Sequence, residues 1–175
     1  MLIAAQIFGI TAVALYLLSY QLKKRVHIIW ATFIANILYV VQYLLLGAFS
    51  GAVMDLLSTI ATFLAAKKNK SYFKRHAKWI AVVIEFIIAV TGVIITIIRH
   101  NWIEFLPIAG AVSQTVALWC DNEQTIRKLS LCAAPFWLLY NALTKAYGAT
   151  IGSAFAIVSI IVSLVRYRKG KNDNK

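Results

Sequence analysis

The feature that most constrains the fold is a stretch of 41 residues, 26–66, that contains no Lys or Arg and only one acid, Asp55. A helix needs about 20 apolar residues to cross the hydrocarbon of a membrane, so this stretch holds two spans. The turn between them is predicted at "GAFSG", residues 47–51. Gly47 and Gly51 can adopt backbone angles that other residues avoid, and Ser50 can cap the next helix. The stretch therefore predicts a helical hairpin buried in a membrane.

The composition of the whole chain agrees with a membrane protein. Of the 175 residues, 61% are hydrophobic and only 14% are charged, whereas a soluble domain is about a quarter charged. The net charge of +12 comes from short basic clusters between apolar runs, which is the pattern of cytoplasmic loops and not of a nucleic-acid surface. The first apolar run precedes its basic cluster, "KKR", so we expect a retained span and not a secretory signal.

Repeating the count of apolar residues along the chain predicts an all-α integral membrane protein with seven transmembrane helices. The expected spans are about 3–21, 26–46, 50–66, 78–98, 103–120, 126–144 and 148–166. With the N-terminus outside, sixteen Lys and Arg residues fall in the inside segments, and only Arg99 and Lys145 fall outside. Because cytoplasmic loops are enriched in Lys and Arg, we expect the N-terminus outside and the C-terminus inside.

Two hairpins in the sequence resemble each other. "QYLLLGAFSGA", residues 42–52, and "YNALTKAYGAT", residues 140–150, both join the end of one apolar span to the start of the next, at an offset of 98 residues. This repeat predicts two parallel three-helix units joined by a linker helix, since one extra helix returns the chain and lets both units point the same way. The expected divisions are a first unit at 1–70, a linker loop and fourth helix at 71–100, a second unit at 101–168 and a cytoplasmic tail at 169–175.

The motifs "QYLLLGAFSGAVMD" and "PFWLLYNALTKAYGA" resemble those of the bacterial inner-membrane family called YgjV, over about residues 3–168. That resemblance implies the arrangement shared by the SWEET sugar transporters, the transporter PnuC and the KDEL receptor: three helices, a linker helix and three more. It implies the bacterial inner membrane as the location, and it implies no activity. The chain departs from the family at Asp55, where Asn is commoner, and at Lys145, where Gly is commoner, so no role is carried over to these two positions.

Polar residues recur at helical spacing inside several expected spans, so that they share one face. In the second span this face carries Thr32, Asn36, Tyr39 and Tyr43. One interpretation is a polar cavity between the two units that binds a small neutral polar solute, because amides hydrogen-bond and aromatic rings stack on such molecules. The alternative is that small and hydroxyl residues let membrane helices pack closely, while Tyr and Trp anchor the span ends. The candidate solute-binding residues are Asn36, Tyr39, Gln114, Trp137, Tyr140 and Asn141.

Two acids and one proline inside the expected spans are further candidates. Asp55 lies near the start of its helix, where an acid is favourable, or it forms a proton or cation site. Glu85 lies deeper, in the fourth span, and is a second candidate for ion or proton coupling. Pro135 removes a backbone donor from the sixth helix and is a candidate hinge.

These observations favour a transporter or facilitator of a small polar solute. The alternative is a membrane receptor or a subunit that binds a partner through the basic segment 67–78 or contacts acidic lipid there. An enzyme is not expected, because the sequence has no paired acids, no nucleophile and base at suitable spacing, and no phosphate-binding loop. We expect no cofactor, no metal and no nucleic acid, with the lipid bilayer as the surroundings and homo-oligomerisation left open.

Overall fold

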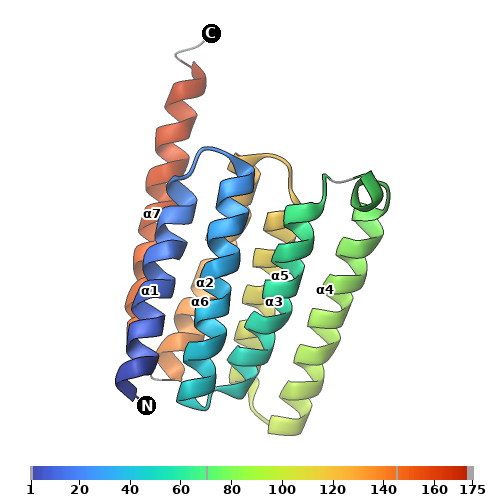
Figure 1. Cartoon of the computed structure of the whole chain (residues 1–175). Helices are drawn as coiled ribbons and strands as arrows, with labels where there is room; N and C mark the ends of the chain where they lie inside the picture. The colour runs from blue at the N-terminus through green and yellow to red at the C-terminus, as the bar shows by residue number, and fades with distance from the viewer. Residues whose placement is uncertain (1, 70, 145, 173–175) are drawn as a thin grey trace.

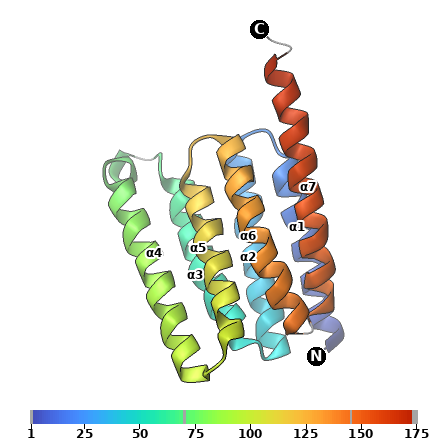
Figure 2. The same cartoon turned by 180° about the vertical axis from the view of Figure 1, so that it is seen from behind.

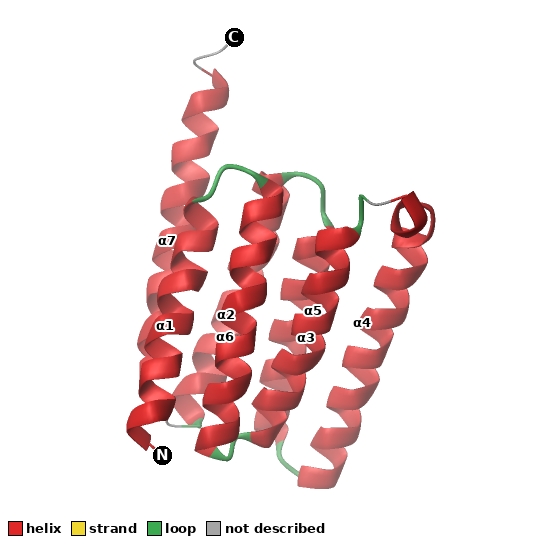
Figure 3. Cartoon of the chain, in the orientation of Figure 1, coloured by secondary structure: helices red, strands yellow, loops and turns green. Residues whose placement is uncertain are grey.

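The computed structural model describes residues 2–69, 71–144 and 146–172, and within these residues it contains helices and short loops but no strand (Figure 3). The described residues form seven α-helices and one 3₁₀-helix: α1 Leu2–Gln21, α2 Arg25–Leu46, α3 Phe49–Lys67, α4 Ser71–Arg99, η1 Trp102–Glu104, α5 Phe105–Trp119, α6 Glu123–Leu143 and α7 Tyr147–Asn172. The seven helices confirm the all-α prediction.

In the described part of the chain, α1, α2, α3, α4 and α7 are long and apolar enough to cross a membrane by themselves. The predicted fifth and sixth spans are also helices, but they do not meet that criterion. α5 has 15 residues because the chain first turns through η1, so it spans about 22 Å of a hydrocarbon layer of about 30 Å. α6 is long enough, but its first turns carry Glu123, Arg127 and Lys128.

The described helices form two layers that face each other. α1, α2 and α3 make one layer, and α7, α6 and α5 make the other (Figure 1; Figure 2 shows the second layer from its own side). α1 packs against α7 at one edge, and α3 packs against α5 at the other. α4 stands outside the two layers and packs against α3 and α5. A space between the layers is therefore bordered by six helices.

The turn inside the long apolar stretch lies where the sequence predicts it, but it is shorter. α2 ends at Leu46, and Gly47 takes a left-handed conformation, with φ 71°, that a glycine adopts without strain. α3 begins at Phe49, so Ser50 lies inside the helix. The expectation that Ser50 caps this helix is therefore wrong. Ser50 instead shares a hydrogen bond of 2.9 Å with the hydroxyl of Tyr140, which connects α3 to α6.

The basic clusters gather at one end of the bundle. The loops that follow α1, α3 and α5 lie at the end where α7 finishes, and the N-terminus lies at the opposite end (Figure 1). This agrees with the charge count, while the orientation in the membrane stays a prediction. Lys145 lies outside the described residues. The tail expected at 169–175 is helical as far as Asn172, and residues 173–175 lie outside the described part.

Basic side chains at this end bond to the last carbonyls of helices in the opposite layer. The guanidinium of Arg25, at the start of α2, donates to the carbonyls of Cys120 at 2.7 Å and Leu118 at 2.8 Å, beside the end of α5. Arg127 of α6 donates to the carbonyl of Leu22 at 2.9 Å, just after α1. Since the last four carbonyls of a helix lack partners within the helix, these donors satisfy groups that would otherwise be unpaired.

Candidate functional site

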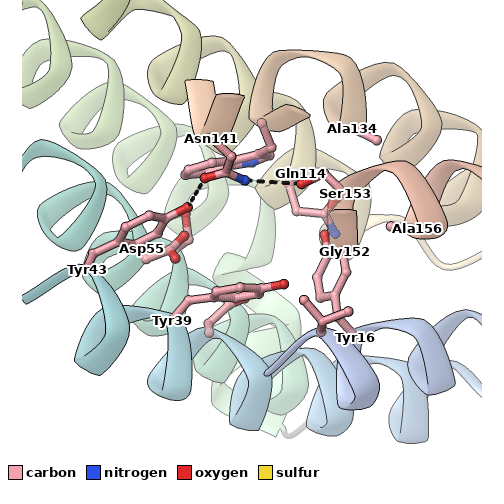
Figure 4. A pocket seen from close by; sticks show the side chains of 14 residues that line it. Tyr16, Tyr39, Tyr43, Asp55, Gln114, Ala134, Asn141, Gly152, Ser153 and Ala156 are labelled. Carbon is pink, nitrogen blue, oxygen red and sulfur yellow. Dashed lines mark hydrogen bonds between the residues drawn. The ribbon is translucent and has the colours of Figure 1, made fainter. Parts of the chain in front are cut away.

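A cavity of about 50 Å³ lies between the two layers (Figure 4). It has room for roughly three to five water molecules. Each of the six helices of the layers contributes to its wall, and no described residue of α4 does. The described residues that line it are Val13, Tyr16, Asn36, Tyr39, Tyr43, Asp55, Ser58, Gln114, Ala134, Trp137, Asn141, Gly152, Ser153 and Ala156.

The residues that line the cavity are related by position in the chain. Most of them form pairs separated by 98 residues, which is also the separation of the bonded pair Tyr43 and Asn141. The pairs are Tyr16 and Gln114, Asn36 and Ala134, Tyr39 and Trp137, Tyr43 and Asn141, Asp55 and Ser153, and Ser58 and Ala156. Positions 98 residues apart, one in each layer, therefore face the same cavity.

Most of the predicted solute-binding residues line this cavity. They are Asn36, Tyr39, Gln114, Trp137 and Asn141. Tyr140 does not: its hydroxyl is buried against α3, where the backbone N–H of Gly51 donates to it at 3.2 Å. A Cβ at Gly51 would lie 3.1 Å from that hydroxyl, so the glycine makes room for the ring. Tyr140 therefore connects the two layers and does not line the cavity.

Asn141 is the centre of a hydrogen-bond chain across the cavity. The hydroxyl of Tyr43 donates to its Oδ1 at 2.6 Å, and its Nδ2 donates to Oγ of Ser153 at 3.1 Å (Figure 4). This chain joins α2, α6 and α7, and it fixes the orientation of the amide. Asn36 is held less tightly, with its Nδ2 donating to Oγ1 of Thr62 at 3.4 Å.

Some polar atoms of the cavity wall have no partner. In the described part of the chain, Nε2 of Gln114 and Oγ of Ser58 are buried and make no hydrogen bond. Buried polar groups are nearly always satisfied by protein, water or a ligand. These two atoms come from opposite layers and are available to a molecule in the cavity.

Aromatic rings form a continuous wall. The rings of Tyr16 and Tyr39 have centroids 6.3 Å apart, those of Tyr39 and Tyr43 are also 6.3 Å apart, and those of Tyr43 and Trp137 are 6.5 Å apart. The last two pairs are stacked, within the separations at which aromatic side chains attract each other. Gly110 of α5 allows this packing, because a Cβ there would lie 2.7 Å from Nε1 of Trp137.

Asp55 lies in the cavity wall and not at the end of its helix. α3 begins at Phe49 and has no acid in its first turn, so the favourable effect of a helix N-terminus, which fades within that turn, does not account for Asp55. The side chain is 6% exposed and points toward the cavity between Tyr43 and Tyr39 (Figure 4). The helix N-terminus therefore does not explain Asp55, and its role as a proton or cation site stays a prediction.

Glu85 and Pro135 lie elsewhere. Glu85 is on α4 near Thr115 of α5, whose hydroxyl donates to the carbonyl of Ala111 at 2.8 Å. Pro135 is exposed on α6, which continues through it from Glu123 to Leu143. Neither lines the cavity, so neither reaches a solute there.

Sequence reasoning missed Tyr16 and Ser153, and it placed Tyr43 on the polar face of its helix without selecting it. The offset of the two hairpins would have found all three residues, since Tyr43 lies 98 residues before Asn141. Ser153 is the counterpart of Asp55, and Tyr16 is the counterpart of Gln114. Among the described residues, no group of three His, Cys, Asp or Glu side chains could hold a metal ion. The cavity is thus equipped to bind a molecule by hydrogen bonds, aromatic faces and one carboxylate.

Comparison with known proteins identifies a family. A family model described as "Imp-YgjV: Bacterial inner membrane protein" matches residues 3–171, which is nearly the whole chain. No curated protein and no solved structure matches this chain. The family resemblance drawn from the two hairpins is confirmed, whereas the wider relationship to SWEET, PnuC and the KDEL receptor stays a prediction.

Proposed function

Because the chain belongs to the Imp-YgjV family of bacterial inner membrane proteins and has a cavity lined by polar and aromatic side chains between two helix layers, we propose that it transports a small polar solute across that membrane. The observation that carries the proposal is the position of the cavity. Six helices of a multi-pass protein converge on it, which is where secondary transporters place their substrate sites. The proposal assigns no catalytic step and no cofactor.

We further propose that the layers are the two repeats expected from the sequence, at 1–70 and 101–168, with α4 as the linker. The helix bounds support this, since α2 and α6 begin 98 residues apart, and so do α3 and α7. The packing supports it too. α1 of the first layer packs against α7, and its counterpart α5 packs against α3, the counterpart of α7. Such a two-fold arrangement is common among transporters built from parallel repeats.

The volume of the cavity limits the solute. About 50 Å³ accommodates a molecule of roughly four or five non-hydrogen atoms, and a sugar or a nucleoside is larger. We therefore propose a very small solute, or a larger one that enters only after the layers separate.

The two layers are bonded to each other toward both ends of the bundle. On the side of the N-terminus, Tyr140 bonds to α3, and on the other side Arg25 and Arg127 bond to helix ends of the opposite layer. A transport cycle would break these sets of contacts in turn, with Pro135 as a candidate hinge in α6. If the flux of Pro135→Ala equals that of the wild type, the hinge role is excluded.

The test is flux into proteoliposomes that contain the purified full chain, with urea, acetamide, ethylene glycol and ethanolamine as solutes. We expect saturable flux of at least one of them. Asn141→Ala should reduce that flux about tenfold, because it removes the amide that connects three helices around the solute. Thr96→Ala is the matched control, since Thr96 is also buried but lies on α4 and bonds only to its own helix. Equal flux through liposomes without protein would contradict the proposal.

A second candidate is a receptor or a partner-binding subunit. α4 supports it, because it packs on α3 and α5 only along one side and exposes large apolar side chains, among them Trp79, Phe86 and Ile98. This function is tested by purification in mild detergent from native membranes. Recovery of one stoichiometric partner, together with absent flux, would favour the second candidate over transport.

A further inference from the structure

We propose that the cavity selects a small organic cation, with the Asp55 carboxylate as its counter-ion and the rings of Tyr16, Tyr39, Tyr43 and Trp137 as its wall. This proposal rests on the proposed transport function and names its substrate class. It replaces the neutral solute expected from the sequence, because that expectation treated Asp55 as separate from the amides and rings.

The first step is the charge of the site. Asp55 is the acid in the cavity wall, it is 6% exposed, and within the described part of the chain no cation forms an ion pair with it. Its neighbours in the wall are hydroxyls, amides and rings. Since burying an unpaired carboxylate is costly, and intramembrane acids usually have a partner, the site lacks one positive charge.

The second step is that the buried or half-buried basic side chains Arg25, Arg127 and Lys68 are engaged at one end of the bundle. Arg25 and Arg127 lie at the end of the bundle where α1 and α5 finish and bond there to backbone carbonyls. Lys68 lies at the same end and pairs with Asp121 at 2.8 Å. The hydrogen bond from Lys68 holds the pKa of Asp121 below its usual range. No described Lys or Arg lines the cavity, so among the described residues the missing positive charge is left to a ligand.

The third step is the chemistry of the wall. The faces of Tyr and Trp rings carry negative electrostatic potential and attract ammonium groups, and quaternary ammonium ions are recognised by cages of such rings. The four rings follow one another around the cavity, with neighbouring centroids 6.3–6.5 Å apart. Asp55 lies in the same wall, between Tyr43 and Tyr39 (Figure 4). A carboxylate among aromatic rings matches a cation whose charge is spread over methyl groups.

The wall suits an inorganic cation less well. Divalent ions such as Ca²⁺ and Mg²⁺ require about six or more oxygen ligands. In this cavity one candidate oxygen, Oδ1 of Asn141, already accepts the hydrogen bond of Tyr43. Much of the remaining surface is aromatic or aliphatic carbon. The volume fits the organic ion, since tetramethylammonium has five non-hydrogen atoms and ethanolammonium has four.

The experiment compares two probes of nearly the same shape, one positively charged and one neutral. Tetramethylammonium carries a positive charge and cannot lose it to a base, while tert-butanol is neutral. Their dissociation constants are measured by calorimetry on the full chain in detergent, at fixed ionic strength set with NaCl. We expect wild-type protein to bind tetramethylammonium about tenfold more tightly than tert-butanol, which is a modest part of the effect of pairing a buried charge.

Variants then assign the selectivity to Asp55. Asp55→Asn keeps the shape of the side chain and should weaken tetramethylammonium binding about tenfold or more, while tert-butanol binding changes by less than about twofold. Asp55→Glu should recover part of the difference between the probes. Glu85→Gln is the matched control: it removes another intramembrane carboxylate, one outside the cavity, and should leave both dissociation constants unchanged.

Each outcome decides the proposal. It is overturned if wild-type protein binds both probes equally, if Asp55→Asn binds tetramethylammonium as tightly as wild type does, or if Glu85→Gln loses as much affinity as Asp55→Asn. The wild-type comparison alone decides it if Asp55→Asn fails to fold. Equal binding of both probes together with saturable flux of acetamide or urea would leave transport intact and refute only the cation. The loss of all binding and all flux would refute both.

Discussion

Arg127 shows how a single charged side chain is accommodated inside this bundle. It is 2% exposed, and its guanidinium donates to the carbonyls of Tyr20 at 3.3 Å and Leu22 at 2.9 Å. It also lies over the ring of Tyr167, 4.4 Å from the centroid. Arg25 makes the corresponding bonds to the end of α5. Both guanidiniums satisfy carbonyls that a helix end leaves unpaired.

We predict that Arg127→Ala lowers the free energy of unfolding by about 2–3 kcal/mol, because it removes charge-assisted hydrogen bonds and leaves buried carbonyls unsatisfied. The measurement is unfolding in mixed micelles titrated with SDS. Lys128→Ala is the control, since Lys128 is the exposed neighbour and should change the stability by less than about 0.5 kcal/mol. Equal losses in the two variants would show that the bonds to α1 contribute nothing specific.

At the scale of helices, glycines let neighbouring helices approach each other, both between the layers and within one layer. A Cβ at Gly152 of α7 would lie 2.1 Å from Cγ2 of Val13 on α1, a separation that real atoms do not show. A Cβ at Gly9 of α1 would lie 2.2 Å from Nε2 of Gln42 on α2. Close approach at small residues is a main source of helix association in membranes, where lipid replaces the hydrophobic effect. The edge of the cavity formed by α1 and α7 therefore depends on Gly152.

We predict that Gly152→Ala lowers the free energy of unfolding by about 1–3 kcal/mol, because the added methyl group forces α1 and α7 apart. Adding Val13→Ala should recover most of the loss, since it removes the atoms that the new methyl group meets. The measurement is a double-mutant cycle in the same SDS titration. Ile151→Val, at the exposed neighbouring position, is the control and should be nearly neutral. Strictly additive losses from Gly152→Ala and Val13→Ala would contradict the steric explanation.

At the scale of the whole molecule, the layers enclose the cavity and contact each other toward both ends. At the end with the basic loops, Lys68, which follows α3, bonds to the carbonyl of Trp119 at the end of α5 and pairs with Asp121. A similar contact lies at the other edge, where Arg166 of α7 donates to Oε1 of Gln21 at the end of α1, at 3.2 Å. Arg166 follows Lys68 by 98 residues, and Gln21 precedes Trp119 by 98 residues. Opening at this end requires both edges of the bundle to separate.

We predict that a reducible bis-methanethiosulfonate cross-link between Lys68→Cys and Asp121→Cys, in a chain with Cys120 and Cys132 replaced by Ala, stops solute flux in proteoliposomes. The reason is that the cross-link keeps α3 next to the end of α5, so that the cavity cannot open on that side. Flux should return when a reductant cleaves the cross-link, and each single cysteine variant treated in the same way should retain its flux. Undiminished flux through the cross-linked protein would rule out opening at this end.

Much of the fold was determined by the sequence alone. The seven helices, the turn at Gly47 and the separation of basic clusters from apolar runs follow from local rules, because a backbone inside lipid must satisfy its hydrogen bonds within each segment. The family could be assigned from two hairpins, because the residues of each hairpin are contiguous in the sequence. The polar stripe along α2, including Asn36 and Tyr39, also followed from helical spacing.

Only the tertiary structure decided which polar groups meet. Tyr140 and Asn141 are neighbours in the chain, but the rotation of α6 turns Asn141 into the cavity and Tyr140 onto α3. The packing of the helices also places Asp55 and Trp137 in the wall of the same cavity. A helix forms from interactions a few residues apart, whereas the direction of each face depends on side chains far away in the sequence. The chain therefore specified its helices locally, and the packing of six of them determined the site.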